Sequence, residues 1–225
     1  MKLLYKTSLA KTIDAINEAL FFDKKIPASQ KKEAVKWIAG RQGLPGSYAG
    51  KLFALTKKDF ESDVRLFTGE KIKSGAGKAH ILGEETCRIL SILEPKNKAL
   101  DKAQKGMGEL LAGHLEGGHE FGTFCCVTCS CALWRNASAG GLKNSKKLLD
   151  AGLKILKSNR DDKGRWGRYP FYYTLFTLSE IDSPKAKAEL KYCQPACEKS
   201  LKRLLKKNDI ISKRRREILT KSIEV

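Results

Sequence analysis

Four cysteines stand close together in the middle of the chain, shortly after two histidines. They are Cys125, Cys126, Cys129 and Cys131, preceded by His114 and His119. Thiolate and imidazole are the ligands that zinc prefers, and a structural zinc site needs four of them in a tetrahedron. The segment lacks the paired C-x-x-C knuckles of a zinc ribbon, so we interpret the cysteines first as small buried residues. Zinc remains the one cofactor to consider, with five candidate ligands: Cys125, Cys126, Cys129, His114 and His119.

A cysteine at the start of a helix can also act as a nucleophile. The internal repeat described below places Cys125 and Cys126 in the first turn of a helix. Unpaired backbone N–H groups and the helix dipole favour the thiolate there, and so lower the pKa of the thiol. His119 is near in sequence, which makes a reactive Cys–His pair a hypothesis. No complete catalytic signature accompanies these residues, so the sequence leaves open whether the chain is an enzyme.

An internal repeat indicates which elements carry these residues. The glycine-aromatic segment at Phe121 recurs forty-five positions later at Trp166. A period of this length is typical of arrays of helical pairs, and no run alternates apolar and polar residues as a strand would. We therefore expect one all-α domain over residues 1–225, built from stacked helical hairpins. The equivalent pairs are Phe121 and Trp166, Gly122 and Gly167, Phe124 and Tyr169, Cys125 and Pro170, and Cys126 and Phe171.

Residues 148–181 (LLDAGLKILKSNRDDKGRWGRYPFYYTLFTLSEI) resemble a repeat of the terpenoid cyclase and protein prenyltransferase superfamily. The α/α toroids of that family alternate a helix, a glycine-aromatic turn and a second helix, and Gly164, Trp166 and Gly167 carry the likeness. The resemblance implies a partial or complete α/α toroid. The family's aspartate-rich D-x-D-D motif is missing, because the only adjacent aspartates, Asp161 and Asp162, lie in a turn. A squalene-cyclase-like reaction is therefore not expected.

In such an array the loops before the inner helices would meet at one rim. Cationic and aromatic side chains near helix N-termini can hold an anionic group, so we predict an anionic or amphipathic small ligand there. The simpler alternative is that glycine and aromatic residues only lock the turns. The predicted rim residues are His80, Glu84, His119, Arg165, Arg168, Tyr172 and Tyr173.

The charge of the chain favours anionic partners. It has 44 Lys+Arg against 25 Asp+Glu, a formal net charge of +19. The C-terminal residues 199–225 read as a basic helical tail that could neutralise phosphates, so a nucleic-acid-associated protein is an alternative function. A solvated charged helix is the other interpretation. The tail cations are Lys199, Lys202, Arg203, Lys206, Lys207, Arg214, Arg215 and Arg216.

Two further expectations concern location and helix ends. Lys6, Lys11, Asp14 and Glu18 interrupt the apolar residues near the start, and seven cysteines accompany no export signal. We therefore expect reduced thiols and a cytoplasmic protein. Glycines in residues 113–122 predict a connection rather than a helix, and Pro195 predicts a break in the helix that starts near Ser183.

Overall fold

The computed structural model describes residues 2–224, which fold as an all-α array. Within that part of the chain there are three isolated backbone bridges but no strand. The helices are α1 (Leu9–Phe21), α2 (Ala28–Ala39), α3 (Lys57–Glu61), α4 (Gly75–Leu93), α5 (Lys98–Glu116), α6 (Val127–Ser138), α7 (Ser145–Ser158), α8 (Phe171–Leu178), α9 (Pro184–Leu204) and α10 (Ile210–Ile223), with a short 3-10 turn, η1 (Tyr48–Gly50).

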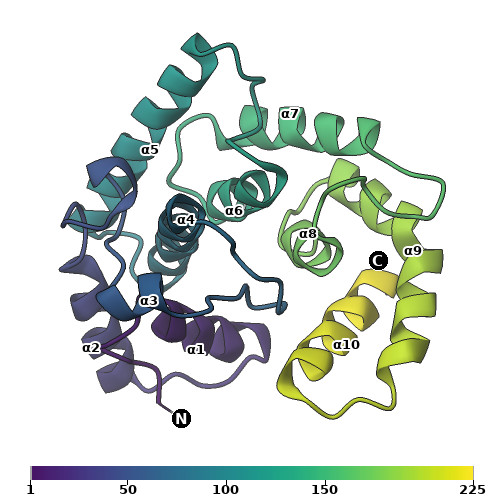
Figure 1. The fold of residues 1–225 in the computed structure, drawn as a ribbon, viewed down its shortest axis with the longest axis horizontal. Coiled ribbons are helices and arrows are strands. Elements are labelled where there is room, and N and C mark those ends of the chain that lie inside the picture. The colour runs from purple at the N-terminus through teal and green to yellow at the C-terminus, as the bar shows by residue number, and fades with distance from the viewer. Residues whose placement is uncertain (1, 225) are drawn as a thin grey trace.

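The helices form an inner and an outer group. Helices α1, α4, α6, α8 and α10 lie inside, and α2, α5, α7 and α9 lie outside them (Figure 1). The pairs α5–α6 and α7–α8 are the two clear copies of the repeat. Gly122 and Gly167, equivalent in the sequence, both have a positive φ, 94° and 45°. Glycine adopts a positive φ at low steric cost, so a glycine turn precedes both α6 and α8.

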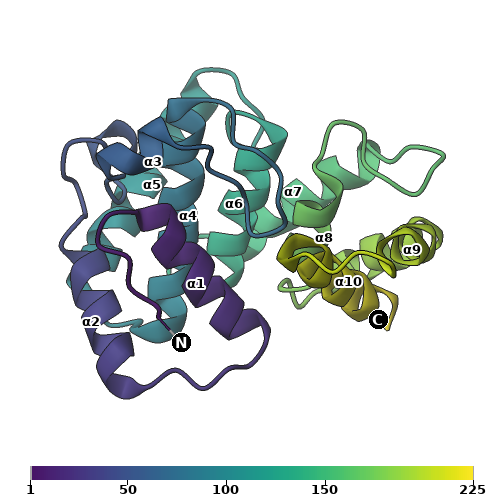
Figure 2. The same cartoon turned by 60° about the horizontal axis from the view of Figure 1, so that its bottom comes forward.

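Helix α4 is the centre of the array. Every residue from Lys78 to Leu90 is buried, because α4 packs against α1, α2, α5 and α6 (Figure 2). A helix that is covered on all sides must also bury polar side chains, and these need partners inside the protein. The polar residues of α4 therefore determine what fills the middle of the molecule.

A buried ionic network fills that middle. Arg135 Nε on α6 donates to Glu85 Oε1 on α4 at 2.6 Å, and the Tyr173 hydroxyl on α8 donates to the same oxygen at 2.5 Å. Arg88 and Arg135 both pair with Glu180. Burial acts to raise the pKa of Glu85, but the charges of Arg135 and Arg88 outweigh it and lower that pKa. Beside Glu85 and Tyr173 there remains a cavity of about 20 Å³, so charged side chains pack the centre.

Arg214 ties the last inner helix to the first. Its two terminal nitrogens donate to both carboxylate oxygens of Asp14 at 2.8 Å, and its Nε donates to Glu18 at 2.8 Å. It also donates to the carbonyl of Phe67 at 3.1 Å. Figure 1 shows α1 and α10 as neighbours at one edge of the array with their ribbons apart, so side chains make the link. The buried Arg214 guanidinium thus helps to join the beginning and the end of the helical array.

Two predicted helix boundaries are wrong. Helix α5 continues to Glu116, so Gly113 and His114 are helical and only the following glycines form the connection. Helix α9 runs through Pro195 without a break. A proline removes one backbone hydrogen bond and crowds the preceding turn, but the long contact of α9 with α10 offsets this cost. In both cases tertiary packing outweighs local propensity.

Candidate functional site

The sulfur of Cys126 caps the N-terminus of α6. Helix α6 begins at Val127, and the N–H of Cys129 donates to Cys126 Sγ at 3.5 Å. Cys125 precedes the cap with a φ of 49°, a left-handed conformation that non-glycine residues seldom adopt. The prediction that both thiols lie in the first turn is therefore corrected: Cys126 is the N-cap, and Cys125 lies outside the helix.

Neighbouring residues hold this turn in place. The N–H of Phe124 donates to Ser130 Oγ at 3.0 Å, and that hydroxyl and the N–H of Ser130 both lie within hydrogen-bond distance of the Cys126 carbonyl. Upstream, Trp134 Nε1 donates to the carbonyl of Gly122 at 2.7 Å. The backbone of Cys126 is therefore fixed from both sides by side chains of α6 itself.

The two thiols of this turn lie in different environments. Cys126 is exposed, whereas Cys129 is 1% exposed. Hydrogen bonding from the Cys129 side chain, the backbone N–H groups of Cys129 and Thr128, and the charge of His80 together overcome burial and lower the pKa of Cys126 to about 5. The hydrogen bond with Cys126, burial and the Cys126 charge raise the pKa of Cys129. The site therefore pairs an accessible thiolate with a buried thiol.

All three histidines of the chain lie in one column of stacked rings beside this turn. His80 stacks on Phe124 with ring centroids 4.4 Å apart, Phe124 on His114 at 4.6 Å, and His114 on His119 at 3.8 Å. Tyr48 meets His80 edge-on at 4.9 Å. This ring column runs from the buried His80 to the exposed His119, and it brings imidazoles from α4, α5 and the following loop to the N-terminus of α6.

The inner end of the ring column contains polar atoms without hydrogen-bond partners. His80 Nε2 lies 3.3 Å from Glu84 Oε1, yet neither nitrogen of His80 nor that oxygen makes a hydrogen bond. His80 is 1% exposed and Glu84 is fully buried. The other Glu84 oxygen accepts from Asn136 Nδ2 at 2.5 Å. His80 and Glu84 therefore face each other in the packed centre without a well-directed hydrogen bond.

The seven predicted rim residues do not form one mouth. Tyr173 is 1% exposed with its hydroxyl on Glu85, and Glu84 is fully buried. Both predictions are wrong, because these side chains point into the packed centre. Arg165 is exposed and lies over Phe171 at 4.4 Å. Arg168 is exposed, and Tyr172 is half-buried under Arg215. His80 and His119 do come together, but in the ring column beside Cys126.

The glycine-aromatic turn after α7 is locked as its simpler interpretation expects. Trp166 is 1% exposed and donates from Nε1 to Glu189 Oε2 at 2.8 Å. Asp161 accepts the backbone N–H groups of Lys163 and Arg165 at 2.9 and 2.8 Å. These contacts give Asp161 a structural role in the turn.

Two of the other predicted sites change in the structure. Across residues 2–224, no three His, Cys, Asp or Glu side chains converge as a metal site would require. In the basic C-terminal segment, Arg214 is buried and paired with Asp14 and Glu18, so its assignment to phosphate binding is wrong. Arg215 and Arg216 donate to main-chain carbonyls. Phosphate binding stays a prediction for the exposed cations of this segment, which are Lys199, Lys202, Arg203, Lys206 and Lys207.

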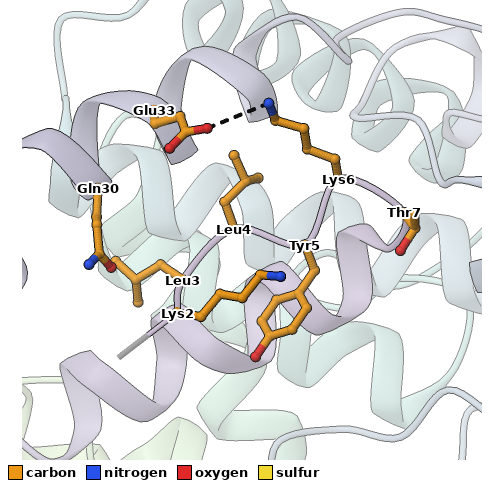
Figure 3. Close-up of a pocket in the computed structure, with 8 residues that line it drawn as sticks. All are labelled: Lys2, Leu3, Leu4, Tyr5, Lys6, Thr7, Gln30 and Glu33. Atoms are coloured by element: carbon orange, nitrogen blue, oxygen red, sulfur yellow. Dashed lines mark ion pairs between the residues drawn. The ribbon is translucent and has the colours of Figure 1, made fainter.

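Two clefts of the described residues contain none of the thiols or imidazoles of this site. One cavity of about 750 Å³ lies between the N-terminal segment and α2 (Figure 3). Its polar groups include the exposed Lys6–Glu33 ion pair at 3.5 Å. A second cavity, of about 740 Å³, runs along α5 and α7 and is lined by apolar residues such as Leu115 and Phe121. The chemistry therefore concentrates at the α6 N-terminus.

From the sequence, Cys126 and Cys129 are expected on one face of a helix as ligand candidates, and His119 is the expected partner of Cys125 or Cys126. The contact of the Cys129 N–H with the Cys126 sulfur is found only in the structure. The spacing Cys-Val-Thr-Cys at a predicted helix start could have indicated this contact. A side chain at the N-cap accepts the backbone N–H of the residue three positions later, which here is Cys129. His80 could not have been found this way, because it reaches the site by stacking on Phe124 from another helix.

In comparisons with known proteins, no protein-family model, no curated protein and no solved structure matches this chain. The resemblance to α/α toroids therefore stays a prediction. Among the described residues, no helix combines the length and the apolar character needed to cross a bilayer. The geometry of the thiol turn is therefore the main evidence for function.

Proposed function

We propose that the chain acts through Cys126 as a thiolate nucleophile. The carrying observation is the exposed sulfur at the N-cap of α6, which accepts the N–H of Cys129 at 3.5 Å. Backbone N–H groups at a helix N-terminus stabilise an anion, and the thiolate is the reactive form of cysteine. Of the three functions considered from the sequence, thiol chemistry has the most geometric support.

A purely structural role for this sulfur is a poor alternative. Serine, threonine, aspartate and asparagine are the residues that cap helices well, and Ser8, Ser74, Ser183 and Asp209 do so in this chain. A cysteine at the same position caps less well and leaves a thiol exposed to solvent. The ring column supplies the surroundings of that thiol, because the charge of His80 contributes to lowering the pKa of Cys126.

The two other functions remain predictions. An anionic small ligand would now have to bind near Arg165 and Arg168 without the buried members of the predicted rim. Binding of nucleic acid would depend on Lys199, Lys202 and their exposed neighbours rather than on Arg214. Neither has a supporting contact as specific as the capped sulfur.

The pH dependence of alkylation tests the proposal. With the pKa of Cys126 lowered to about 5, the rate with iodoacetamide should rise as pH passes through that value and change little near neutrality. An ordinary thiol would titrate near 9.0. The thiolate of Cys126 should give a fast phase of alkylation at neutral pH. Cys126→Ser should abolish that phase while keeping the helix cap, because serine is a good N-cap residue. Cys125→Ser is the matched control and should retain it. Persistence of the fast phase in Cys126→Ser would refute the proposal.

A further inference from the structure

Cys126 and Cys129 lie together at the N-terminus of α6. Cys126 is exposed, whereas Cys129, three residues later, is 1% exposed. The N–H of Cys129 donates to Cys126 Sγ, so the backbone of the second thiol is held against the first sulfur. A disulfide joins cysteines whose Cα atoms lie about 4.4–6.8 Å apart, and Cys126 and Cys129 are close enough for the N–H of Cys129 to reach the Cys126 sulfur.

The other nearby thiols lack this relation. Cys125 lies outside the helix with a φ of 49°, and it makes no hydrogen bond with Cys126 among the described residues. Cys131 is fully buried and contacts the Thr174 hydroxyl at 3.6 Å. Cys129 is therefore the thiol placed to react with a group bound on Cys126.

We propose that Cys126 and Cys129 form a redox-active dithiol whose substrate is a disulfide. Cys126 is the attacking thiol and Cys129 the resolving thiol. This inference rests on the proposed nucleophilic role of Cys126 and specifies its substrate class.

The reaction balances in two exchanges. In the first, the Cys126 thiolate attacks one sulfur of R–S–S–R′, a Cys126–S–R bond forms, and R′–S⁻ leaves. In the second, Cys129 gives its proton to R′–S⁻, its sulfur attacks Cys126 Sγ, and R–S⁻ leaves. Two electrons pass from the dithiol to the substrate disulfide, and the Cys126–Cys129 disulfide remains. A second thiol compound must reduce that disulfide to complete a cycle.

The surroundings of Cys129 favour this order of events. Before the first exchange, the hydrogen bond with Cys126, burial and the Cys126 charge raise the pKa of Cys129. Once Cys126 is bound in a mixed disulfide it carries no negative charge, so two of these three causes weaken. Cys129 then loses its proton more easily. The resolving thiol is therefore held inactive until the attacking thiol has reacted.

Trapping of the mixed disulfide tests the inference. The full chain is treated with hydroxyethyl disulfide and its mass is measured under denaturing, non-reducing conditions. The wild type should lose two hydrogens and carry no adduct, with the new bond mapped to Cys126–Cys129. Cys129→Ser should accumulate one hydroxyethylthiol adduct on Cys126 in most chains. Cys129→Ala serves as a second variant in case serine disturbs the buried site.

The outcomes separate the two proposals. Fast alkylation of Cys126 together with a wild-type adduct as stable as that of Cys129→Ser would overturn the dithiol inference alone. Slow alkylation of Cys126 would overturn the proposed function as well. A disulfide mapped to Cys125 instead of Cys129 would also overturn the inference, and Cys125→Ser should behave as the wild type.

Two further substrates test whether the dithiol acts on small-molecule disulfides or on protein disulfides. Oxidised glutathione represents small disulfides with carboxylates, which suit a chain of net charge +19. Insulin represents protein disulfides. Oxidation of the Cys126–Cys129 pair by either substrate supports the dithiol chemistry. The substrate that oxidises the pair faster indicates which class of disulfide the protein prefers. Failure of all three disulfides to oxidise the pair would contradict it.

Discussion

At the scale of single residues, the site depends on an asymmetry between chemically identical groups. Cys126 and Cys129 are both cysteines, yet hydrogen bonding lowers the pKa of one and raises the pKa of the other. The direction follows from position, because the backbone N–H of Cys129 donates to the N-cap sulfur, whereas the Cys129 sulfur is buried beside the negative charge of Cys126. Position in the helix thus determines the reactivity of each thiol.

Substitution of His80 tests its electrostatic role. Its charge is the last of the causes that lower the pKa of Cys126, so His80→Gln should raise the midpoint of the alkylation profile modestly. The expected result is a smaller thiolate fraction, and so slower alkylation, at any pH below the midpoint. Tyr48→Phe is the control, because it keeps an aromatic ring against His80 and removes only a hydroxyl. An unchanged midpoint in His80→Gln would show that His80 has no electrostatic part in the site.

At the scale of elements, close packing between α6 and α7 supports the thiol turn. Gly152 of α7 lies against Trp134 of α6 and the carbonyl of Gly122, and the Trp134–Gly122 hydrogen bond passes beside it. Gly122 begins the turn that leads to Cys126. Helix α7 therefore helps to position the Cys126 sulfur through the contact of Gly152 with Trp134 and Gly122.

Two identical substitutions in equivalent outer helices test this contact. A Cβ at Gly152 would lie 2.3 Å from Trp134 Nε1 and 2.8 Å from the Gly122 carbonyl oxygen. Gly152→Ala should therefore lower the free energy of unfolding by about 1–3 kcal/mol. Gly108→Ala in α5 meets nothing within 4 Å and should raise it by about 0.5–1 kcal/mol. Urea denaturation measures both, and equal shifts would contradict the packing argument.

The sequence predicts the repeats better than it predicts the helix boundaries. Glycine-aromatic spacing at Phe121 and Trp166 reports a local turn, so the all-α hairpins follow from it. The continuity of α9 through Pro195 does not, because contact with α10 offsets a local cost. Likewise, the position of Cys126 near a helix start follows from the local sequence, although the sequence predicts the first turn and the structure makes Cys126 the N-cap. His80 belongs to another helix, and its stacking on Phe124 depends on tertiary packing.

At the scale of the whole molecule, the fold uses charge for two purposes. Inside, Glu85 and Arg135 pack the centre and Arg214 joins α10 to α1. Outside, the excess of lysine and arginine gives the +19 charge, which favours anionic reactants without selecting one. The thiol site lies at one end of α6, held by α4, α5 and α7 through the contacts described above. Its reactivity is therefore a property of the folded molecule, absent from the unfolded chain.

The measurement that tests this claim most directly compares alkylation of Cys126 in the native and the urea-unfolded protein at a pH about one unit above 5. Native Cys126, with a pKa of about 5, is then mostly thiolate, whereas a thiol with the ordinary value of 9.0 is almost fully protonated. A thiolate of lower pKa is intrinsically less nucleophilic, with a Brønsted coefficient of about 0.4–0.5. The account predicts that native Cys126 reacts about tenfold faster than unfolded Cys126. Equal or slower reaction in the native state would contradict it.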